Sequence, residues 1–416
     1  MRSADSSLNS FSLPPPWTSQ QQHRFEALVG RLTAAIPVSF SWVENPAWHA
    51  FCAEFIPGAH MFSPRERAKG NEATGQCDGW SGENHHHYLA FMMVAGRECH
   101  TVQLVDASAE RKTAENLLGH MKSSIYIMET EFGVFVVAFC SDASGESRKA
   151  RVILGKERPD LVLPDCYAHQ VNLVVGDYFK TKATFLLYTE QATDLITWLR
   201  SKTFVLALLR DIQKGGGRVR TVIRAVLTRW TSHYLAYDRL LELQPALRAL
   251  VSTDELRGSS NSQVITGDAS AKRRATRMVG IIKDSAFWDA LACMKLHLEP
   301  LAIAANIAQA ANTRPDTVLL MFGVLRLRYD SLPQSDPRHI VARDAVCASL
   351  EKRWAVADQD IFITAVILNP FHKLRPFRAA RWSTTAGAYT LITRLWTRFY
   401  KHEVVPQSLF GELMNY

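Results

Sequence analysis

The chain has 416 residues, 47% of them hydrophobic and 10% aromatic, which is enough to build two or three domains with their own cores. Its net charge of +8 suits a polyanionic partner without requiring one. Seven cysteines without a CxxC pair argue against a disulfide framework and for a reducing compartment. The longest apolar run, residues 132–140, is far shorter than the about 20 residues of a membrane span. We therefore expect an intracellular protein with no membrane partner.

The first part of the chain changes character near residue 25. Residues 1–25 are rich in Ser, Pro and Gln, which predicts a disordered tail. Residues 26–70 form a predicted N-terminal helical segment. Apolar residues recur there at helical spacing, and a second short helix starts after Asn45-Pro46.

Residues 71–180 show the pattern of a mixed sheet. The runs 87–96 and 98–107 are of β type and are separated by Gly96-Arg97, which predicts an antiparallel hairpin. A helix with a serine cap is expected to follow over 108–125.

Two more strands complete this predicted domain. The run 132–140 is continuously apolar, as expected of a strand buried on both faces. A helix follows "SDASGE", and residues 160–166 predict one further strand. Strands alternating with helices indicate an α/β fold with a mixed sheet.

Helical periodicity dominates the rest of the chain. We predict a helical domain over 181–366 and a C-terminal helical part over 367–416. Breaks are expected at 214–218, 257–272 and 333–337, where Gly, Ser and Pro gather.

Two aspartates stand where a β-type stretch meets a turn. They are Asp78, in "ATGQCDGW", and Asp142, directly after the apolar run 132–140. Carboxylates brought together across neighbouring strands could hold divalent metal ions for phosphodiester chemistry. The alternative is that both are turn aspartates that cap a bend or a helix. The histidines at 85–87 are interpreted as part of a turn before the next strand.

Cys166 and His169 form a Cys-x-x-His pair. Such a pair can ligate zinc, but a structural zinc site needs four ligands, and no second pair stands at a conventional spacing. We therefore favour the interpretation that hydrogen bonds hold His169 and that Cys166 packs as a small apolar residue.

A basic stretch runs into an aromatic residue in the helical block. Arginines combined with a tryptophan suit phosphate neutralisation and base stacking. A solvated basic helix followed by a core tryptophan is the alternative. The residues concerned are Arg218, Arg220, Arg224, Arg229 and Trp230. A second basic cluster, residues 271–277, is expected to form an exposed loop.

Five stretches occur in the order found in hAT-superfamily transposases, and the chain resembles the fungal type of that family. They are "ATGQCDGW", "FCSDASGESRKAR", "CYAHQVNLVVGDYF", "LTRWTSHYLAYDRLLEL" and "ILNPFHKL". The resemblance implies a ribonuclease-H-like α/β mixed sheet with a large all-α insertion.

The resemblance also implies roles for single residues. Asp78 and Asp142 correspond to the first two catalytic carboxylates, which would bind Mg²⁺ or Mn²⁺. Trp230 corresponds to an aromatic that grips a flipped base. Cys166, His169 and Asn172 fall in the family's Cys/His motif. The implied partner is double-stranded DNA at transposon ends, in the nucleus, with a homo-oligomer allowed.

The chain departs from the family beyond Leu374. The family carries its third carboxylate, a glutamate, further on, and only Glu403 and Glu412 follow Leu374 here. We therefore expect a truncated copy whose strand-transferase chemistry is incomplete. The alternative is a non-enzymatic nuclear DNA-binding or protein-interaction protein.

Overall fold

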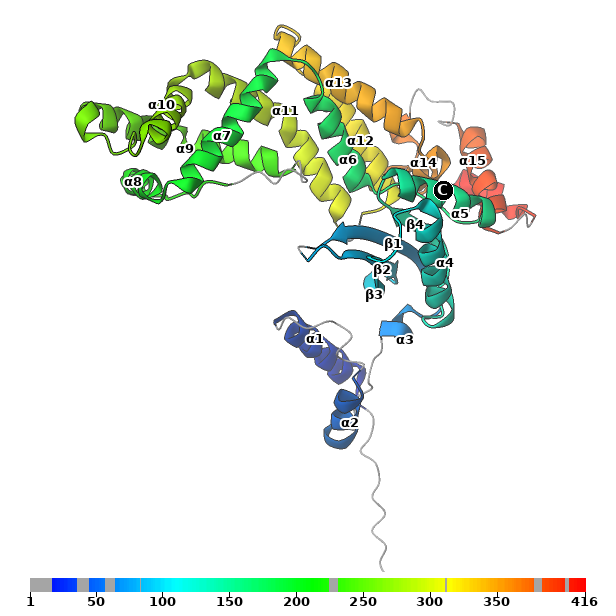
Figure 1. Cartoon of the computed structure of the whole chain (residues 1–416). Helices are drawn as coiled ribbons and strands as arrows, with labels where there is room; N and C mark the ends of the chain where they lie inside the picture. Colours follow the sequence, from blue (N-terminus) through cyan, green and yellow to red (C-terminus); the bar gives the residue numbers. More distant parts are fainter. Residues whose placement is uncertain are drawn as a thin grey trace, which may run out of the picture. The chain divides into compact units, whose positions relative to one another are not determined.

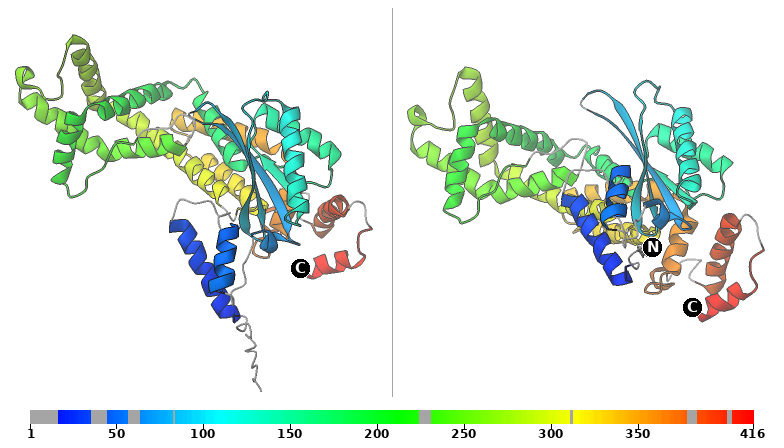
Figure 2. Two further views of the ribbon diagram at one scale, coloured as in Figure 1. Left: turned by 60° about the horizontal axis from the view of Figure 1, so that its bottom comes forward. Right: turned by 90° about the horizontal axis from the view of Figure 1, so that it is seen from below.

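The structure is a computed structural model in which contacts divide the chain into two compact units, Met1–Phe139 and Cys140–Tyr416 (Figures 1 and 2). The structure describes residues 17–35, 45–56, 64–82, 84–223, 231–310, 313–377, 384–400 and 404–416.

Three helices precede the sheet in the first unit: α1 (Ser19–Ala35), α2 (Pro46–Phe55) and α3 (Pro64–Ala68). The predicted tail is wrong for residues 19–25, which are helical. Thr18 and Gln21 form a capping box, because the Thr18 backbone N–H donates to Gln21 Oε1 at 2.9 Å and the Gln21 N–H donates to Thr18 Oγ1 at 3.4 Å. The predicted start of α2 is confirmed, since the side chain of Asn45 caps it and Pro46 is its first residue.

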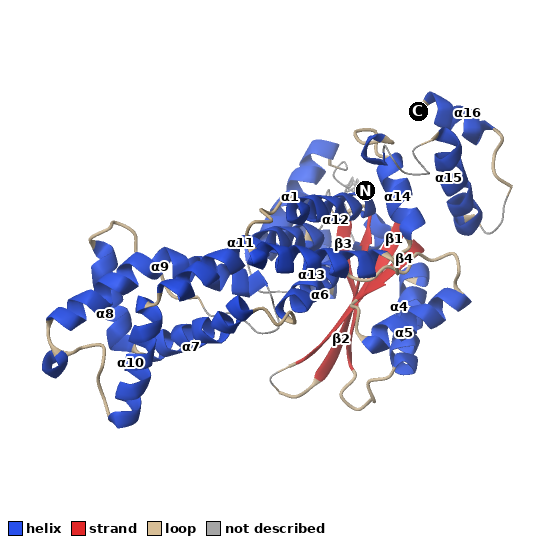
Figure 3. Ribbon diagram, turned by 90° about the horizontal axis from the view of Figure 1, so that it is seen from above, coloured by secondary structure: helices blue, strands red, loops and turns tan. Residues whose placement is uncertain are grey.

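The sheet has four strands in the order β3-β2-β1-β4 (Figure 3). The predicted hairpin is confirmed, because β2 pairs antiparallel with β3 and the turn Gly96-Arg97 has positive φ at both residues. β1 also pairs antiparallel with β2, with Asp78 opposite Ala90. The strands are β1 (Glu72–Ser81), β2 (His87–Ala95), β3 (Glu98–Asp106) and β4 (Phe135–Ser141).

The helix α4 (Ala114–Thr130) covers one face of this sheet. The predicted serine cap is wrong: the cap is Thr113, whose side chain accepts from the Asn116 N–H. Ser108 instead donates to Asp106, which keeps it in the turn after β3. The predicted apolar stripe is confirmed, with Leu117, Met121 and other side chains buried against the unit.

The last two predicted strands differ in outcome. β4 is buried on both faces after its first residue: Val136 and Phe139 are three residues apart, so they lie on opposite faces, and both are buried, whereas Phe135 is 67% exposed. Residues 160–166 do not form a strand and contribute isolated bridge residues, Val162 and Asp165, of which Asp165 pairs parallel with Ser141. Pro164 lacks the N–H that a longer ladder would need.

After β4, the described elements of the second unit are all helices. The predicted breaks near 214–218, 257–272 and 333–337 are confirmed, because α8, α9 and α12 end close to them. The helices are α5 (Gly145–Glu157), α6 (Tyr167–Phe179), α7 (Tyr188–Ser201), α8 (Thr203–Lys214), α9 (Thr231–Leu256), α10 (Ala269–Lys283), α11 (Ser285–Gln309), α12 (Pro315–Asp330), α13 (Pro337–Trp354), α14 (Gln359–Ile367), α15 (Thr385–Phe399) and α16 (Ser408–Asn415). A mixed sheet with a large helical part agrees with the predicted α/β class.

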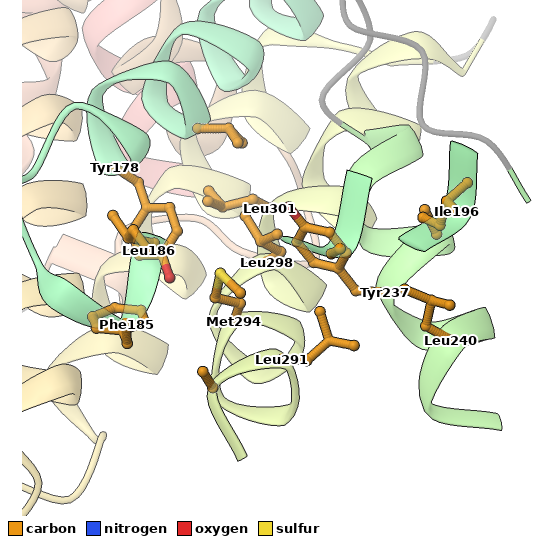
Figure 4. Packing of buried hydrophobic residues seen from close by; sticks show 14 of the residues in the cluster. Tyr178, Phe185, Leu186, Ile196, Tyr237, Leu240, Leu291, Met294, Leu298 and Leu301 are labelled. Carbon is orange, nitrogen blue, oxygen red and sulfur yellow. The ribbon is translucent and has the colours of Figure 1, made fainter. Parts of the chain in front are cut away.

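The core of the helical unit is built around α11, which packs against α6, α9 and α12 (Figure 4). Among the described residues, α11 is the helix long and apolar enough to cross a bilayer, and 56% of that apolar window is buried inside the protein. Its many buried side chains are typical of the central helix of a folded domain.

Candidate functional site

The strands β1 and β4 start side by side. The N–H of Phe135 donates to the Asn71 carbonyl at 2.9 Å. Four residues further along each strand the chains approach closely again, because a Cβ added to Gly75 would lie 2.5 Å from the ring of Phe139. Gly75 is four residues after Asn71 and Phe139 is four after Phe135, so the two strands run parallel in a constant register.

Asp78 lies inside β1, and the interpretation of Asp78 as a turn aspartate is wrong. Its side chain is exposed, and its Oδ1 accepts from the Gly79 N–H at 2.9 Å. Side chains alternate along a strand, so Asp78 faces away from Gly75. A Cβ at Gly75 would meet Met128 of α4 at 3.2 Å, which places Asp78 on the sheet face opposite α4.

Asp142 is the first residue after β4 and is half-buried. Its Oδ1 accepts from the Ser144 N–H at 3.4 Å, a bend of the kind expected for a turn aspartate. The cap of α5 is Ser144, which accepts from the Ser147 N–H at 3.2 Å. The carboxylate of Asp142 is therefore not the helix cap.

A buried arginine that the sequence reasoning missed fixes this turn. The guanidinium of Arg151 donates to the carbonyls of Ser141 at 2.9 Å and Asp142 at 2.7 Å. It also forms an ion pair with Asp165, whose second oxygen accepts from Gln170 at 2.8 Å. The side chain of Arg151 is only 5% exposed. One cation thus joins the end of β4, the bridge residue Asp165 and α6.

The sequence held a signal for Arg151. The buried residues of α5 are Ser147, Ala150, Arg151 and Leu154, an i, i+3, i+4, i+7 stripe. A charged residue within such a stripe must find a partner inside the protein, because an unpaired buried charge is costly.

The polar network continues from α6 to α13. Arg353 donates to the Gln170 carbonyl at 3.2 Å and to Asp177 at 3.0 Å, and Ser349 donates to Asp177 at 2.8 Å. Burial by itself would raise the pKa of Asp177. The hydrogen bonds from Ser349 and Lys180 and the charge of Arg353 outweigh burial and lower that pKa.

The predicted Cys/His motif lies at the start of α6. Cys166 is the residue that precedes the helix, and its side chain makes no capping hydrogen bond. His169 and Asn172 lie in the first two turns and are half-buried. Within the described part of the chain, neither Cys166 nor His169 belongs to a group of three residues that could share a metal. Hydrogen bonding of His169 stays a prediction.

Three other residues in the helical unit are close enough together to share a metal ion. Cys293 and His297 on α11 and His339 on α13 bring their ligand atoms within 4.8 Å of one another. The sequence reasoning missed this group, because His339 is 42 residues from His297 and no spacing rule connects them.

The basic and aromatic stretch is described only in part. Arg224, Arg229 and Trp230 lie outside the described residues. Arg218 is exposed, whereas Arg220 lies 3.5 Å from Glu242, so part of its charge is neutralised. Both arginines line a cavity of about 540 Å³ between α8 and α9.

The second basic cluster is part of α10, so its prediction as a loop is wrong. Asp268 caps the helix by accepting from the Ala271 N–H at 2.8 Å, and Ala275 and Met278 anchor it in the core. Lys272, Arg273 and Arg274 are exposed. The helices α8, α9 and α10 gather at one end of the helical unit, away from α14 (Figures 1 and 3).

No protein-family model matches the chain, and no curated protein matches it in sequence. The resemblance to hAT transposases therefore stays a prediction that rests on the five sequence stretches.

Proposed function

We propose that the chain is a transposase-derived, nuclear DNA-binding protein. In this proposal its ribonuclease-H-like core keeps two carboxylates of a strand transferase, and its nuclease chemistry is incomplete. The helical unit supplies the basic surface that contacts double-stranded DNA.

The register of β1 and β4 is the observation that carries the proposal. Asp78 stands seven residues after Asn71, and Asp142 stands seven residues after Phe135. Parallel neighbouring strands lie about 4.8 Å apart and rise equally per residue. Both aspartates are seven residues past the hydrogen-bonded pair Asn71 and Phe135. This equal spacing supports the expectation that the two carboxylates stand at the same level and on the same face of the sheet. That is the arrangement in which two carboxylates hold Mg²⁺ or Mn²⁺.

The network around Arg151 explains how the second carboxylate would be held. Its guanidinium binds the carbonyl of Asp142 and leaves the carboxylate to other partners. Asp165 is unsuited to be the missing third ligand, because Arg151 and Gln170 occupy its two oxygens. In the C-terminal part, Glu412 is exposed on α16, and Glu403 lies outside the described residues. With two carboxylates the metals are under-coordinated and turnover should be severely reduced.

Exposed cations at one end of the helical unit support DNA binding. Arg218 lines the cavity between α8 and α9, and Lys272, Arg273 and Arg274 lie on α10. Each cation that neutralises a phosphate releases counterions. The logarithm of the binding constant should therefore fall linearly with the logarithm of the salt concentration.

A cleavage assay tests the chemistry. The full chain is incubated with hAT terminal-repeat DNA and Mg²⁺ or Mn²⁺, beside Asp78→Asn and Asp142→Asn, with Asp211→Asn on the exposed surface of α8 as the control. We expect no strand cleavage from any of the four proteins. Metal-dependent DNA cleavage by the wild-type chain would overturn the claim that its nuclease chemistry is incomplete, if Asp78→Asn and Asp142→Asn both abolish it and Asp211→Asn retains it.

Fluorescence anisotropy with a labelled duplex tests the binding. We expect association at low salt that weakens steeply between 50 and 200 mM, a loss on the order of 10³-fold for about six phosphate contacts. A chain that fails to bind duplex DNA at low salt would end the DNA-binding proposal.

A further inference from the structure

Three metal-ligating side chains meet inside the helical unit. The Nε2 of His297 lies 2.8 Å from the Nδ1 of His339 and 3.7 Å from the Sγ of Cys293. Cys293 and His297 are four residues apart on α11, which puts both on the same side of that helix. Cys293 and His297 are 6% and 1% exposed, respectively.

These distances are close to those of a tetrahedral site. Zinc binds sulfur at about 2.3 Å and nitrogen at about 2.05 Å, so tetrahedral ligands lie about 3.6 Å apart for S and N and about 3.3 Å apart for two N atoms. The distance between the Sγ of Cys293 and the Nε2 of His297 is already within about 0.1–0.2 Å of the value required. The two imidazoles must separate by about 0.5 Å, which a small rotation of the half-buried His339 achieves.

Partners around His297 fix the ring in the orientation that a ligand needs. The hydroxyl of Tyr178 lies 3.0 Å from Nδ1, so this nitrogen can donate its proton to Tyr178 while Nε2 presents a lone pair. Tyr329 donates to the His297 carbonyl and fixes the backbone. Figure 4 shows Tyr178 and Phe185 lying together beside α11, and the ring of Phe185 packs edge-on against His297.

The fixed charges that act on His297 come from Asp336 and Arg338, which pair with each other at 2.6 Å. Their charges therefore largely cancel, and a divalent ion would meet no net positive charge from them.

A surface cavity lies beside the group. Asp289 and Ala290, one helical turn before Cys293, line a cavity of about 480 Å³, together with Arg338 and Phe185. The cavity reaches the helical turn that precedes Cys293, and Cys293 itself does not line it.

We propose that Cys293, His297 and His339 bind a zinc ion that links α11 to α13, with water or a solvent anion as the fourth ligand. A Cys thiolate with two imidazoles is the donor set that Zn²⁺ prefers, whereas Mg²⁺ and Mn²⁺ favour oxygen. The proposal is independent of the Asp78 and Asp142 carboxylates. Its alternative is a metal-free hydrogen bond between the two histidines.

The test measures metal content and affinity on the full chain. After dialysis against EDTA and then ZnCl₂ and desalting, we expect about one zinc per chain by plasma mass spectrometry. Cobalt added to the metal-free protein should give a thiolate-to-cobalt charge-transfer band and the visible bands of a tetrahedral ion. Zinc at about 100 times its Kd should raise Tm by about 5 °C or more.

Two variants and one matched control make the test specific. Cys293→Ala and His339→Gln should each weaken zinc binding at least about 100-fold, since even outer-shell changes cost 10- to 100-fold. Cys293→Ala should also remove the charge-transfer band. Cys347→Ala, a buried cysteine on α13 outside the group, should change neither.

Three results would overturn the proposal. They are zinc well below one per chain in the folded wild-type protein, an unchanged stoichiometry in Cys293→Ala and His339→Gln, and a cobalt spectrum without the thiolate band. Circular dichroism of each variant confirms that a loss of zinc is not a loss of the fold.

Discussion

The polar group at the end of β4 and the Cys293, His297 and His339 group differ in how their charges are satisfied. Around Arg151, one buried cation is matched by Asp165 and by two carbonyls, so the group fixes the geometry of the chain. In the helical unit, Cys293, His297 and His339 bring their ligand atoms within 4.8 Å of one another. A closed ion pair thus indicates a positioning role, and converging metal-ligating side chains indicate a binding site.

The largest effect is expected from breaking the closed ion pair. Arg151→Met removes the cation and leaves Asp165 half-buried without it, which should lower the free energy of unfolding by about 3–5 kcal/mol. Urea denaturation measures this change. Arg148→Met, on the exposed side of α5, is the control and should change stability by less than about 0.5 kcal/mol. Equal effects of the two substitutions would show that Arg151 is not the link between β4 and α6.

A single methyl group tests the pairing of β1 with β4. Gly75→Ala places a Cβ 2.5 Å from the ring of Phe139, so the ring must shift, at a cost of about 1–3 kcal/mol. Gly119→Ala is the control, because nothing lies within 4 Å of its Cβ on α4 and alanine favours the helix by about 0.5–1 kcal/mol. A neutral or stabilising Gly75→Ala would contradict the close approach of the two strands.

Buried histidines should make both units sensitive to acid. Burial lowers the pKa of His100 on β3 and of His233 on α9 below the ordinary value of 6.5. The unfolded chain therefore takes up protons first, so stability is complete above pH 6.5 and falls as the pH drops below it.

The expected slope is at most about 1.4 kcal/mol per pH unit for each histidine. Urea melts between pH 7.5 and 5 measure it. His100→Gln and His233→Gln should each give a shallower loss of stability, and unchanged slopes in both variants would count against the buried, neutral state of these side chains.

The smallest effect concerns the basic end of the helical unit. Arg218→Ala should reduce the slope of log K against log salt by about 1 and weaken duplex binding equally for different sequences. Arg220→Ala should do less, because Glu242 already neutralises part of its charge. Arg148→Ala, exposed on α5 and outside the α8–α10 end, serves as the control and should leave the slope unchanged. A larger effect at Arg220 than at Arg218 would contradict this ranking.

The features of the fold that depend on local residue patterns were predicted correctly from the sequence. The hairpin turn at Gly96-Arg97, the Asn45 cap and the helical block all follow from residue spacing and turn chemistry. The prediction failed where a competing local signal decided the outcome. Thr113 replaced Ser108 as a cap, Pro164 prevented a fifth strand, and Asp268 started a helix in a predicted loop.

The candidate sites divide in the same way. Asp78 and Asp142 could be selected from the sequence, because both were expected near β-type stretches; Asp142 does follow β4 directly, whereas Asp78 lies inside β1. The partner of Arg151 and the convergence of His297 with His339 could not be predicted, because each depends on which helices pack together. Tertiary packing, and not spacing, brings together residues 42 positions apart.

A crystal structure of the full chain soaked with Mn²⁺ tests the central claim most directly. The measurement is the separation of the Asp78 and Asp142 carboxylates, with anomalous scattering used to locate the metal. We predict that both carboxylates lie within bridging reach of one Mn²⁺ or of a pair of ions about 3.5–4 Å apart. A well-ordered sheet in which the two carboxylates are separated by more than roughly 8 Å would contradict the proposed function.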